Sequence, residues 1–343
     1  RLWFETTPNK KKWFPCLKGG EYRKWYGNHS YVVNWENDGL EVKSTGRATV
    51  RNADKLFVSG ISWSRITSYP SFRIMPEGYF FESASGVCFP DKENISFTLG
   101  LLNKESVNLM VFSLIEKTKV DWDSFESSWD FKKHPLLRNV STISESFNQW
   151  QAECDDRFNQ LKANEEELNR IFIDIYGLQD ELTPEVEDKD VTVRKADLQR
   201  DIKSLLSYAV GCMFGRYSTY KDGLLFAGEP YSLQAFVDKM NDRPGTISDE
   251  ELERAYRNEG VVVDEMFFPD TDNVIPITDE EYLDDDIVSR LCAWLKAVYG
   301  ADTLEENLDY IAKALGNKGS TSREIIRNYF LNDFFKDHCQ TYS

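Results

Sequence analysis

The sequence has few of the residues from which metal and disulfide sites are built. Its 343 residues include 3 histidines and 6 cysteines, and no two cysteines form a Cys-x-x-Cys pair. Structural zinc sites need such closely spaced ligands, so no metal site is expected. Scattered, unpaired cysteines are typical of a reducing compartment, and we therefore expect a cytoplasmic protein.

Signatures of membrane proteins and of several enzyme classes are also absent. No run of 18 apolar residues and no signal peptide occurs, so no membrane segment is predicted. The sequence lacks Gly-x-Ser-x-Gly, His-Glu-x-x-His and the Gly-rich phosphate loop of nucleotide-binding enzymes. It also lacks the Asp-Pro-Pro-Tyr or Asn-Pro-Pro-Tyr tetrad that an amino-methyltransferase needs to hold an extruded base. We predict no catalytic, cofactor or metal residues in the chain, and Gly19-Gly20 is expected to be a turn.

Positive charge is scarce overall but concentrated near the beginning of the chain. The formal net charge of −17 argues against binding of nucleic acid over the whole surface. Residues 1–75, however, hold 13 Lys+Arg against 6 Asp+Glu, whereas residues 139–343 hold 21 against 42. The simplest interpretation is a basic module joined to an acidic one.

The basic module contains a dense run of cations and aromatic rings, KKKWFPCLKGGEYRKWYGNHSYVVNWENDG, at residues 10–39. Cations bind phosphates and aromatic faces stack on bases, so this mixture suits nucleic acid. We predict phosphate contacts from the cations Lys11, Lys12, Lys18, Arg23 and Lys24, and base contacts from Asn34 and Asn37. In the alternative interpretation, the tryptophans are core residues of a small β domain and the lysines form a solvated loop.

A second segment, GISWSRITSYPSFRIMPEG at residues 60–78, combines arginine with serine and threonine. Arg65 and Arg73 are the best candidates there for reading base edges. Alternatively, Trp63, Phe72 and their apolar neighbours form a packed strand pair, and the serines belong to ordinary turns.

The helical period begins near Thr142. Thr142 and Glu145 form a capping-box pattern, and apolar residues then recur at spacings of three, four or seven. They predict a helix of roughly 35–40 residues, longer than most globular helices. A second helix is predicted at residues 194–214, and the two should form an antiparallel hairpin. The same Ser/Thr-x-x-Glu pattern predicts further helix starts at Ser248, Thr278, Thr303 and Thr321.

Together these patterns predict an α+β protein in three parts. Residues 1–138 would form a basic, β-rich recognition domain, residues 139–217 a long helical hairpin, and residues 218–343 an acidic, mostly helical region. β-Branched and aromatic runs predict strands at Ser30–Trp35, Glu41–Lys43, Lys55–Ile61 and Gly78–Glu82, with a turn at Asn37-Asp38-Gly39. Ser96–Phe112 should contain a strand or short helix followed by a helix.

The run KWFPCLKGGEYRKWYGNHSYVVNWENDG resembles the C-terminal half of the adenine-specific DNA methyltransferases of BREX phage-defence systems, the PglX family, which are similar to type IIG restriction-modification enzymes. The resemblance continues through ISWSRI, FRIMPEGYFFES, FTLGLLN, DWDSFESSWDFKKHPLL and SLLSYAVGCMFGRYS, over nearly the whole chain. It implies a parent enzyme that methylates adenine N6 with S-adenosylmethionine, through an upstream methyltransferase domain. The sequence begins with Arg1 rather than Met, so we expect a piece of this larger protein. The piece would recognise double-stranded DNA without being catalytic itself.

Two points remain open at the level of sequence. The family usually carries a further stretch between segments like FTLGLLNKESVNLMVF and DWDSFESSWDF, whereas here only Ser113–Val120 separates them. The alternative function is a protein-interaction scaffold, in which the acidic half docks other defence-system proteins and the basic run is a solvated rim.

Overall fold

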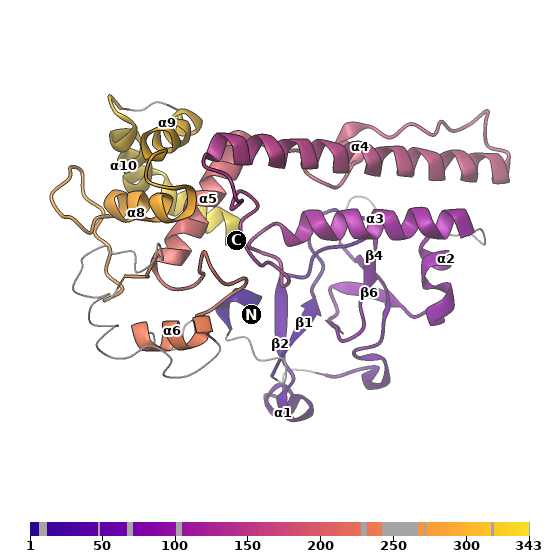
Figure 1. Cartoon of the computed structure of the whole chain (residues 1–343). Helices are drawn as coiled ribbons and strands as arrows, with labels where there is room; N and C mark the ends of the chain where they lie inside the picture. Colours follow the sequence, from indigo (N-terminus) through magenta and orange to yellow (C-terminus); the bar gives the residue numbers. More distant parts are fainter. Residues whose placement is uncertain are drawn as a thin grey trace. The chain divides into compact units, whose positions relative to one another are not determined.

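The computed structural model describes residues 1–6, 12–46, 49–66, 71–100, 105–227, 232–241, 267–270, 272–316 and 319–342. It confirms the α+β class, because the described strands all precede residue 89 and helices dominate the rest (Figure 1). The chain divides into two compact units. Unit 1 comprises residues 1–130 and 153–195, and unit 2 comprises residues 131–152 and 196–343. Each unit is thus built from two separate stretches, unlike the three consecutive parts expected from the sequence.

Unit 1 contains two small sheets of three strands. The first has the order β2-β1-β5, with β1 (Trp13–Leu17) antiparallel to β2 (Tyr31–Asn34) and parallel to β5 (Phe80–Phe81). The second has the order β4-β3-β6 and is antiparallel throughout, with β3 (Gly60–Ser64), β4 (Phe72–Met75) and β6 (Ser85–Cys88). A common core of Leu17, Met75 and Tyr79 joins strands of both sheets.

The predicted turn at Asn37-Asp38-Gly39 is confirmed, since these residues have φ values of 51, 58 and 70°. The turn opens α1 (Glu36–Ser44). A Cβ on Gly39 would lie 2.8 Å from the ring of Trp35, so glycine is needed both for its conformation and for the close approach.

Two of the expected strands are wrong in place or type. Residues 41–43 are helical, because local hydrogen bonds such as Ser44 Oγ to the Glu41 carbonyl (2.8 Å) stabilise a turn of helix instead. In the segment 55–61, pairing starts only at Gly60, because Phe57 has a φ of 66° that no regular strand accepts. The strand at residues 30–35 is confirmed, and only Phe80–Phe81 pairs within 78–82.

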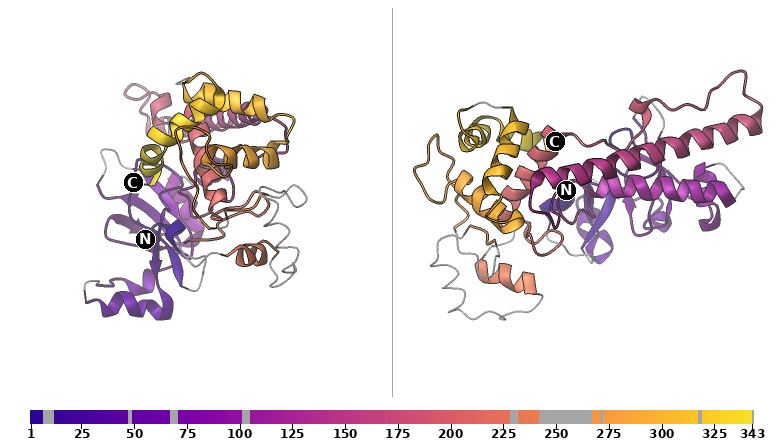
Figure 2. Two further views of the ribbon diagram at one scale, coloured as in Figure 1. Left: turned by 90° about the vertical axis from the view of Figure 1, so that its left-hand side faces the viewer. Right: turned by 45° about the horizontal axis from the view of Figure 1, so that its top comes forward.

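Three helices complete unit 1: α2 (Ile95–Gly100), α3 (Glu105–Asp123) and most of α4 (Ile143–Tyr176). The short helix followed by a longer one is as predicted for residues 96–112, and residues 113–120 continue α3 without a break. α3 runs antiparallel to α4, as Figures 1 and 2 show, with Asn164 bonded to Ser113 at 3.3 Å and Arg157 close to Asp121 at 3.7 Å. Their shared core includes Val111, Leu114, Phe158, Leu161 and Leu168.

The return leg after α4 is an irregular connection, residues 177–197, rather than a second helix. It runs back along α4, where Asn169 donates to the Pro184 carbonyl (3.1 Å) and the Val186 amide donates to Glu166 (3.2 Å). Buried Val186, Val191 and Val193 join the α3–α4 core. The second long helix, α5 (Leu198–Met213), begins after this connection and belongs to unit 2.

Unit 2 is helical around a core that includes Leu205, Trp294, Leu308 and Ile326, all fully buried. Besides α5, the described helices are α6 (Leu233–Asn241), α8 (Ile287–Tyr299), α9 (Leu304–Leu315), α10 (Ser322–Asn332) and α11 (Phe334–Tyr342). α5 contacts α8, α9 and α11, and α10 contacts its neighbours in sequence. No helix among the described residues is both long and apolar enough to cross a bilayer.

The capping patterns predict helix starts with mixed success. Thr142 and Thr321 accept from the amides of Glu145 and Glu324 (both 3.2 Å), as expected. Thr303 precedes α9, but its hydroxyl donates to the Ser141 carbonyl. The start at Thr278 is wrong, because α8 is instead capped by Asp286, whose carboxylate accepts from the amides at 288 and 289. The start predicted at Ser248 lies outside the described residues.

Candidate nucleic-acid interface

The aromatic rings of the run at residues 10–39 serve mainly in packing. Tyr26 and Trp35 are 4% and 6% exposed, and the Trp35 ring lies 4.8 Å from that of Phe80. The half-buried indole of Trp25 donates to the Glu165 carboxylate (2.8 Å). These rings therefore form the core of a β module, as the alternative interpretation of the run expected.

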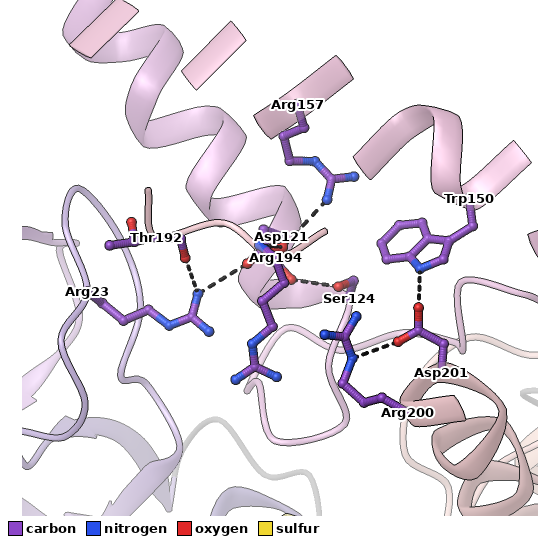
Figure 3. A network of polar contacts seen from close by, with 9 residues as sticks. All are labelled: Arg23, Asp121, Ser124, Trp150, Arg157, Thr192, Arg194, Arg200 and Asp201. Carbon is purple, nitrogen blue, oxygen red and sulfur yellow. Dashed lines mark hydrogen bonds and ion pairs between the residues drawn. The ribbon is translucent and has the colours of Figure 1, made fainter. Parts of the chain in front are cut away.

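Arg23 is buried in a polar network (Figure 3). Its guanidinium donates to the Asp121 carboxylate (3.1 Å) and to the Thr192 carbonyl (3.2 Å), and it lies 4.8 Å from the Trp122 ring. Asp121 also accepts from the Arg194 amide (3.1 Å). The network thus connects the segment around Arg23 to α3 and to the return leg. A guanidinium held in this way is not free to bind a phosphate.

Figure 3 also shows a separate polar group that belongs to unit 2. There the carboxylate of Asp201, in the first turn of α5, accepts from the Trp150 indole (3.2 Å) and from Arg200 Nε (2.8 Å). This group fixes the start of α5 against the first turns of α4.

Lys24 and Arg73 are also engaged by the protein. The Lys24 ammonium lies 2.8 Å from Glu165, whose side chain is 4% exposed. Arg73 is 1% exposed, and its guanidinium donates to the Arg23 carbonyl and to the hydroxyls of Ser64 and Ser71. Bonding to protein groups argues against DNA contact by Arg23, Lys24 and Arg73 in this conformation, and the two arginines are also buried.

Three of the predicted residues lie together at one end of the β1–β2 pair. Lys12 is partly exposed, and its ammonium lies 3.6 Å from the Glu36 carboxylate. Asn34 is opposite Trp13 in the β1–β2 pair, and its side-chain oxygen accepts from the Glu36 amide (3.1 Å). Asn37 is exposed in the left-handed turn that follows. Lys11 lies outside the described residues.

Lys18 and Arg65 remain exposed, and each directly follows a strand of a different sheet, β1 and β3 respectively. The Arg65 amide donates to the Ala84 carbonyl (3.1 Å). Gly19 approaches the same carbonyl, since a Cβ there would lie 3.2 Å from it. The backbone segments that carry the two cations therefore meet at Ala84, and the Lys18 ammonium lies 5.0 Å from the centre of the Tyr31 ring.

An aromatic surface adjoins Arg65. Trp63 pairs with Phe72 across β3 and β4, with ring centroids 5.8 Å apart, and the Phe72 side chain is 48% exposed. The Arg65–Ala84 bond extends the strand by one residue, so Arg65 projects from the same face as Trp63. Ile66 beside it is 95% exposed. We call Trp63, Arg65, Ile66 and Phe72 the outer-face patch.

The sequence pattern does not reveal the outer-face patch as a unit. Trp63 and Phe72 are expected from it only as a packed pair, and they do pair, but on the outward face of the sheet. The available signal was the spacing of Trp63 and Arg65 by two residues, which places both on one side of a strand.

The residues near Gly19-Gly20 do not fit S-adenosylmethionine. No helix follows this turn directly, and the Asn28 side chain fills the space above Gly20, where a Cβ would lie 2.9 Å from it. Within the described ranges, no cluster of three or more His, Cys, Asp or Glu side chains could hold a metal.

Comparison with known proteins identifies relatives that match almost the whole chain. The chain is 41% identical over 381 aligned residues to the adenine-specific methyltransferase PglX of Lacticaseibacillus casei (strain Zhang). The alignment covers 97% of this chain and 29% of that protein. This chain belongs to the PglX family. The PglX-family chain is also 30% identical over 404 residues to the adenine-specific methyltransferase BrxX of Escherichia coli O9:H4 (strain HS), covering 100% of the chain and 32% of that relative. No protein-family model matches the chain.

The chain spans less than a third of the length of these two relatives. Both alignments are longer than its own 343 residues, so both relatives contain residues that have no counterpart here. The alignment lengths do not locate these residues, so the further stretch that the family resemblance implies at residues 113–120 stays a prediction.

Proposed function

We propose that unit 1 contacts double-stranded DNA and helps to select the adenine that a full-length PglX-family protein methylates. The observation that carries the proposal is the outer-face patch, where half-exposed aromatic rings adjoin the exposed Arg65. The relatives are named as adenine-specific methyltransferases, which supports DNA as the substrate.

Each part of the patch suits a different contact with DNA. Aromatic rings contribute about 1–3 kcal/mol per stacked base, and an arginine can bond a guanine edge through two donors. Lys18, whose backbone segment also meets Ala84, is an exposed cation that can neutralise a phosphate. Lys12, Asn34 and Asn37 form a second polar site at the far end of β1, where they would add contacts outside the patch.

Methyl transfer itself is assigned to another part of the full-length protein. An adenine methyltransferase must extrude its base and bind S-adenosylmethionine, and the Gly19-Gly20 turn does not fit that cofactor. We therefore propose an upstream methyltransferase domain of the same polypeptide as the partner of this chain.

Duplex binding by the 343-residue chain tests the proposal. Arg65→Ala and Trp63→Ala should each weaken binding at least tenfold, as measured by fluorescence anisotropy at low salt. Lys92→Ala is the matched control, because Lys92 is an exposed cation of the same unit (69% exposed) that lies outside the patch. Equal loss in the control, or no loss in the patch variants, would contradict the assignment.

The full-length protein provides the second test. Mapping of methylated adenines in cells should show that Arg65→Ala changes or abolishes the methylated site, whereas Lys92→Ala leaves it intact. A methylation pattern unaffected by Arg65→Ala and Trp63→Ala would exclude a role for the patch in site selection.

A specific observation also favours the scaffold function for unit 2. Residues 272–286 expose Val274, Ile277, Tyr282 and Leu283 among several acidic side chains, with Val274 and Tyr282 both 64% exposed. Such a surface suits a protein partner that is basic and apolar. Under this function, a Tyr282→Ala and Leu283→Ser variant would retain adenine methylation but lose phage protection, and the reverse pattern would contradict it.

A further inference from the structure

Among the residues that the structure describes, a buried arginine on the inner face of the second sheet has no acidic partner. Arg73 in β4 is 1% exposed, and burial together with the nearby charge of Arg23 lowers the pKa of its guanidinium to about 10. Its bonds go to a carbonyl and two hydroxyls, which are neutral acceptors. Over the described residues no carboxylate lies within ion-pair distance of it. A buried charge of this kind is costly unless an opposite charge balances it.

Several polar atoms around Arg73 also lack partners within the described part of the chain. They are Arg73 Nε, the hydroxyls of Ser62 and Ser85, and both ring nitrogens of His29, on side chains that are at most 3% exposed. Ser62 stands opposite Arg73 in the β3–β4 pair, and Ser85 stands opposite Ser64 in the β3–β6 pair, so these side chains share one face. Native proteins leave few buried polar groups unpaired, so this concentration calls for an explanation.

The unpaired groups can all act as donors. Arg73 Nε and the two hydroxyls carry hydrogens, and His29 is neutral, with one ring N–H, because burial and the charges of Arg73 and Lys119 lower its pKa to about 3. A ligand that accepts from several donors and carries one negative charge would satisfy both the bonds and the charge. Water would satisfy the bonds alone, and a cation would be repelled.

We propose that the inner face of β4-β3-β6 binds a small monovalent anion, chloride in the cell, against Arg73, Ser62, Ser85 and His29. The single guanidinium charge and the full enclosure of these side chains favour a monovalent halide over phosphate. The ion would lock β3, β4 and β6 together beneath the outer-face patch, and its binding does not depend on DNA.

Thermal unfolding of the full 343-residue chain tests the site without DNA. The melting temperature should rise with sodium chloride or bromide in a saturable way, and more than with sodium gluconate at equal ionic strength. Ser62→Ala should lower the apparent halide affinity about tenfold. The matched control is Ser44→Ala, because Ser44 is exposed in the same unit. Crystals grown in bromide should show an anomalous peak beside Arg73.

Arg73→Met should abolish the halide dependence, and if that variant does not fold, Ser62→Ala and Ser85→Ala carry the test. Identical melting in chloride and gluconate, stabilisation by phosphate but not by halide, or no bromide peak beside Arg73 would each overturn the proposal. Because no DNA is present, none of these results bears on the role of the outer-face patch.

Discussion

Arg23 and Asp121 show how one buried contact holds distant parts of unit 1 together. Their side chains are 3% and 1% exposed and lie 3.1 Å apart. Removing Arg23 leaves the buried Asp121 carboxylate with only the Arg157 guanidinium at 3.7 Å and the Arg194 amide to balance it. Breaking a buried ion pair typically costs about 3–5 kcal/mol, and the remaining contacts place this one toward the lower end. Arg23→Met should therefore lower the free energy of unfolding by about that amount, as measured by urea denaturation.

A surface pair gives the control for this prediction. Lys92 and Glu77 lie 2.7 Å apart but are 69% and 70% exposed, so Lys92→Met should cost at most about 1 kcal/mol. Comparable losses for Arg23→Met and Lys92→Met would show that the Arg23 network contributes no more than a solvated pair.

His29 makes unit 1 sensitive to acid. Its folded pKa is lowered to about 3 by burial and by the charges of Arg73 and Lys119, whereas in the unfolded chain the ring titrates near pH 6.5. Between these values the unfolded state binds the extra proton. The contribution of His29 to stability is therefore complete above pH 6.5 and is lost as the pH falls, by up to about 1.4 kcal/mol per pH unit.

The variant His29→Phe tests this dependence, because it keeps a ring between Tyr26 and Tyr79 and removes the titration. In halide-free buffer, urea unfolding from pH 7 to pH 4.5 should show a shallower loss of stability in the variant than in the natural chain. Parallel pH profiles for the two proteins would refute the assignment.

The sequence predicted which residue types gather near the start of the chain but not which of them face solvent. Arg23, Lys24 and Arg73 resemble surface cations in a linear pattern. The partners of Arg23 and Lys24, Asp121 and Glu165, lie about 100 and 140 positions further along, and only the folded chain brings them close. Lys18 and Arg65 stay exposed because no such partner reaches them among the described residues.

At the scale of elements, Gly86 is what allows Trp63 to lie across β6. A Cβ at this position would be 2.2 Å from the indole, so the ring must move. We expect Gly86→Ala to cost about 1–3 kcal/mol in stability and to shift the tryptophan fluorescence. It should also weaken duplex binding. Ser83→Ala, a change at an exposed position in the turn before β6, should alter none of these three properties. Normal DNA binding by Gly86→Ala would separate Trp63 from the proposed function.

Helices were predicted more accurately than strands, for physical reasons visible in α4 and α1. The α4 stripe and the Thr142–Glu145 cap depend on residues three or four positions apart, which a sequence displays directly. The return leg could not be predicted, because the valines at 186, 191 and 193 are fixed by packing against α3 and α4. Likewise, residues 41–43 have strand-like composition but are helical, with local bonds such as that from Ser44 Oγ to the Glu41 carbonyl.

At the scale of the whole molecule, the proposed DNA contact should depend on salt through the exposed cations. If Lys12, Lys18 and Arg65 each neutralise one phosphate, log affinity should fall with log salt at a slope of about −2.7. Contacts from Arg23 and Lys24 as well would steepen the slope beyond about −4. Titration of the double variant Lys18→Ala and Arg65→Ala should give a slope near −1, and an unchanged slope would place the phosphate contacts elsewhere.

The split composition of unit 1 has a consequence for its biosynthesis. Val111 and Leu114 leave the ribosome well before Leu161 and Val186, the side chains that cover them in the finished protein. Until translation has passed residue 195, the nascent chain carries an apolar strip that chaperones can bind. A protein truncated near residue 130 should therefore aggregate. A truncated protein that retains residues 153–195 should stay in solution, because these residues pack over Val111 and Leu114.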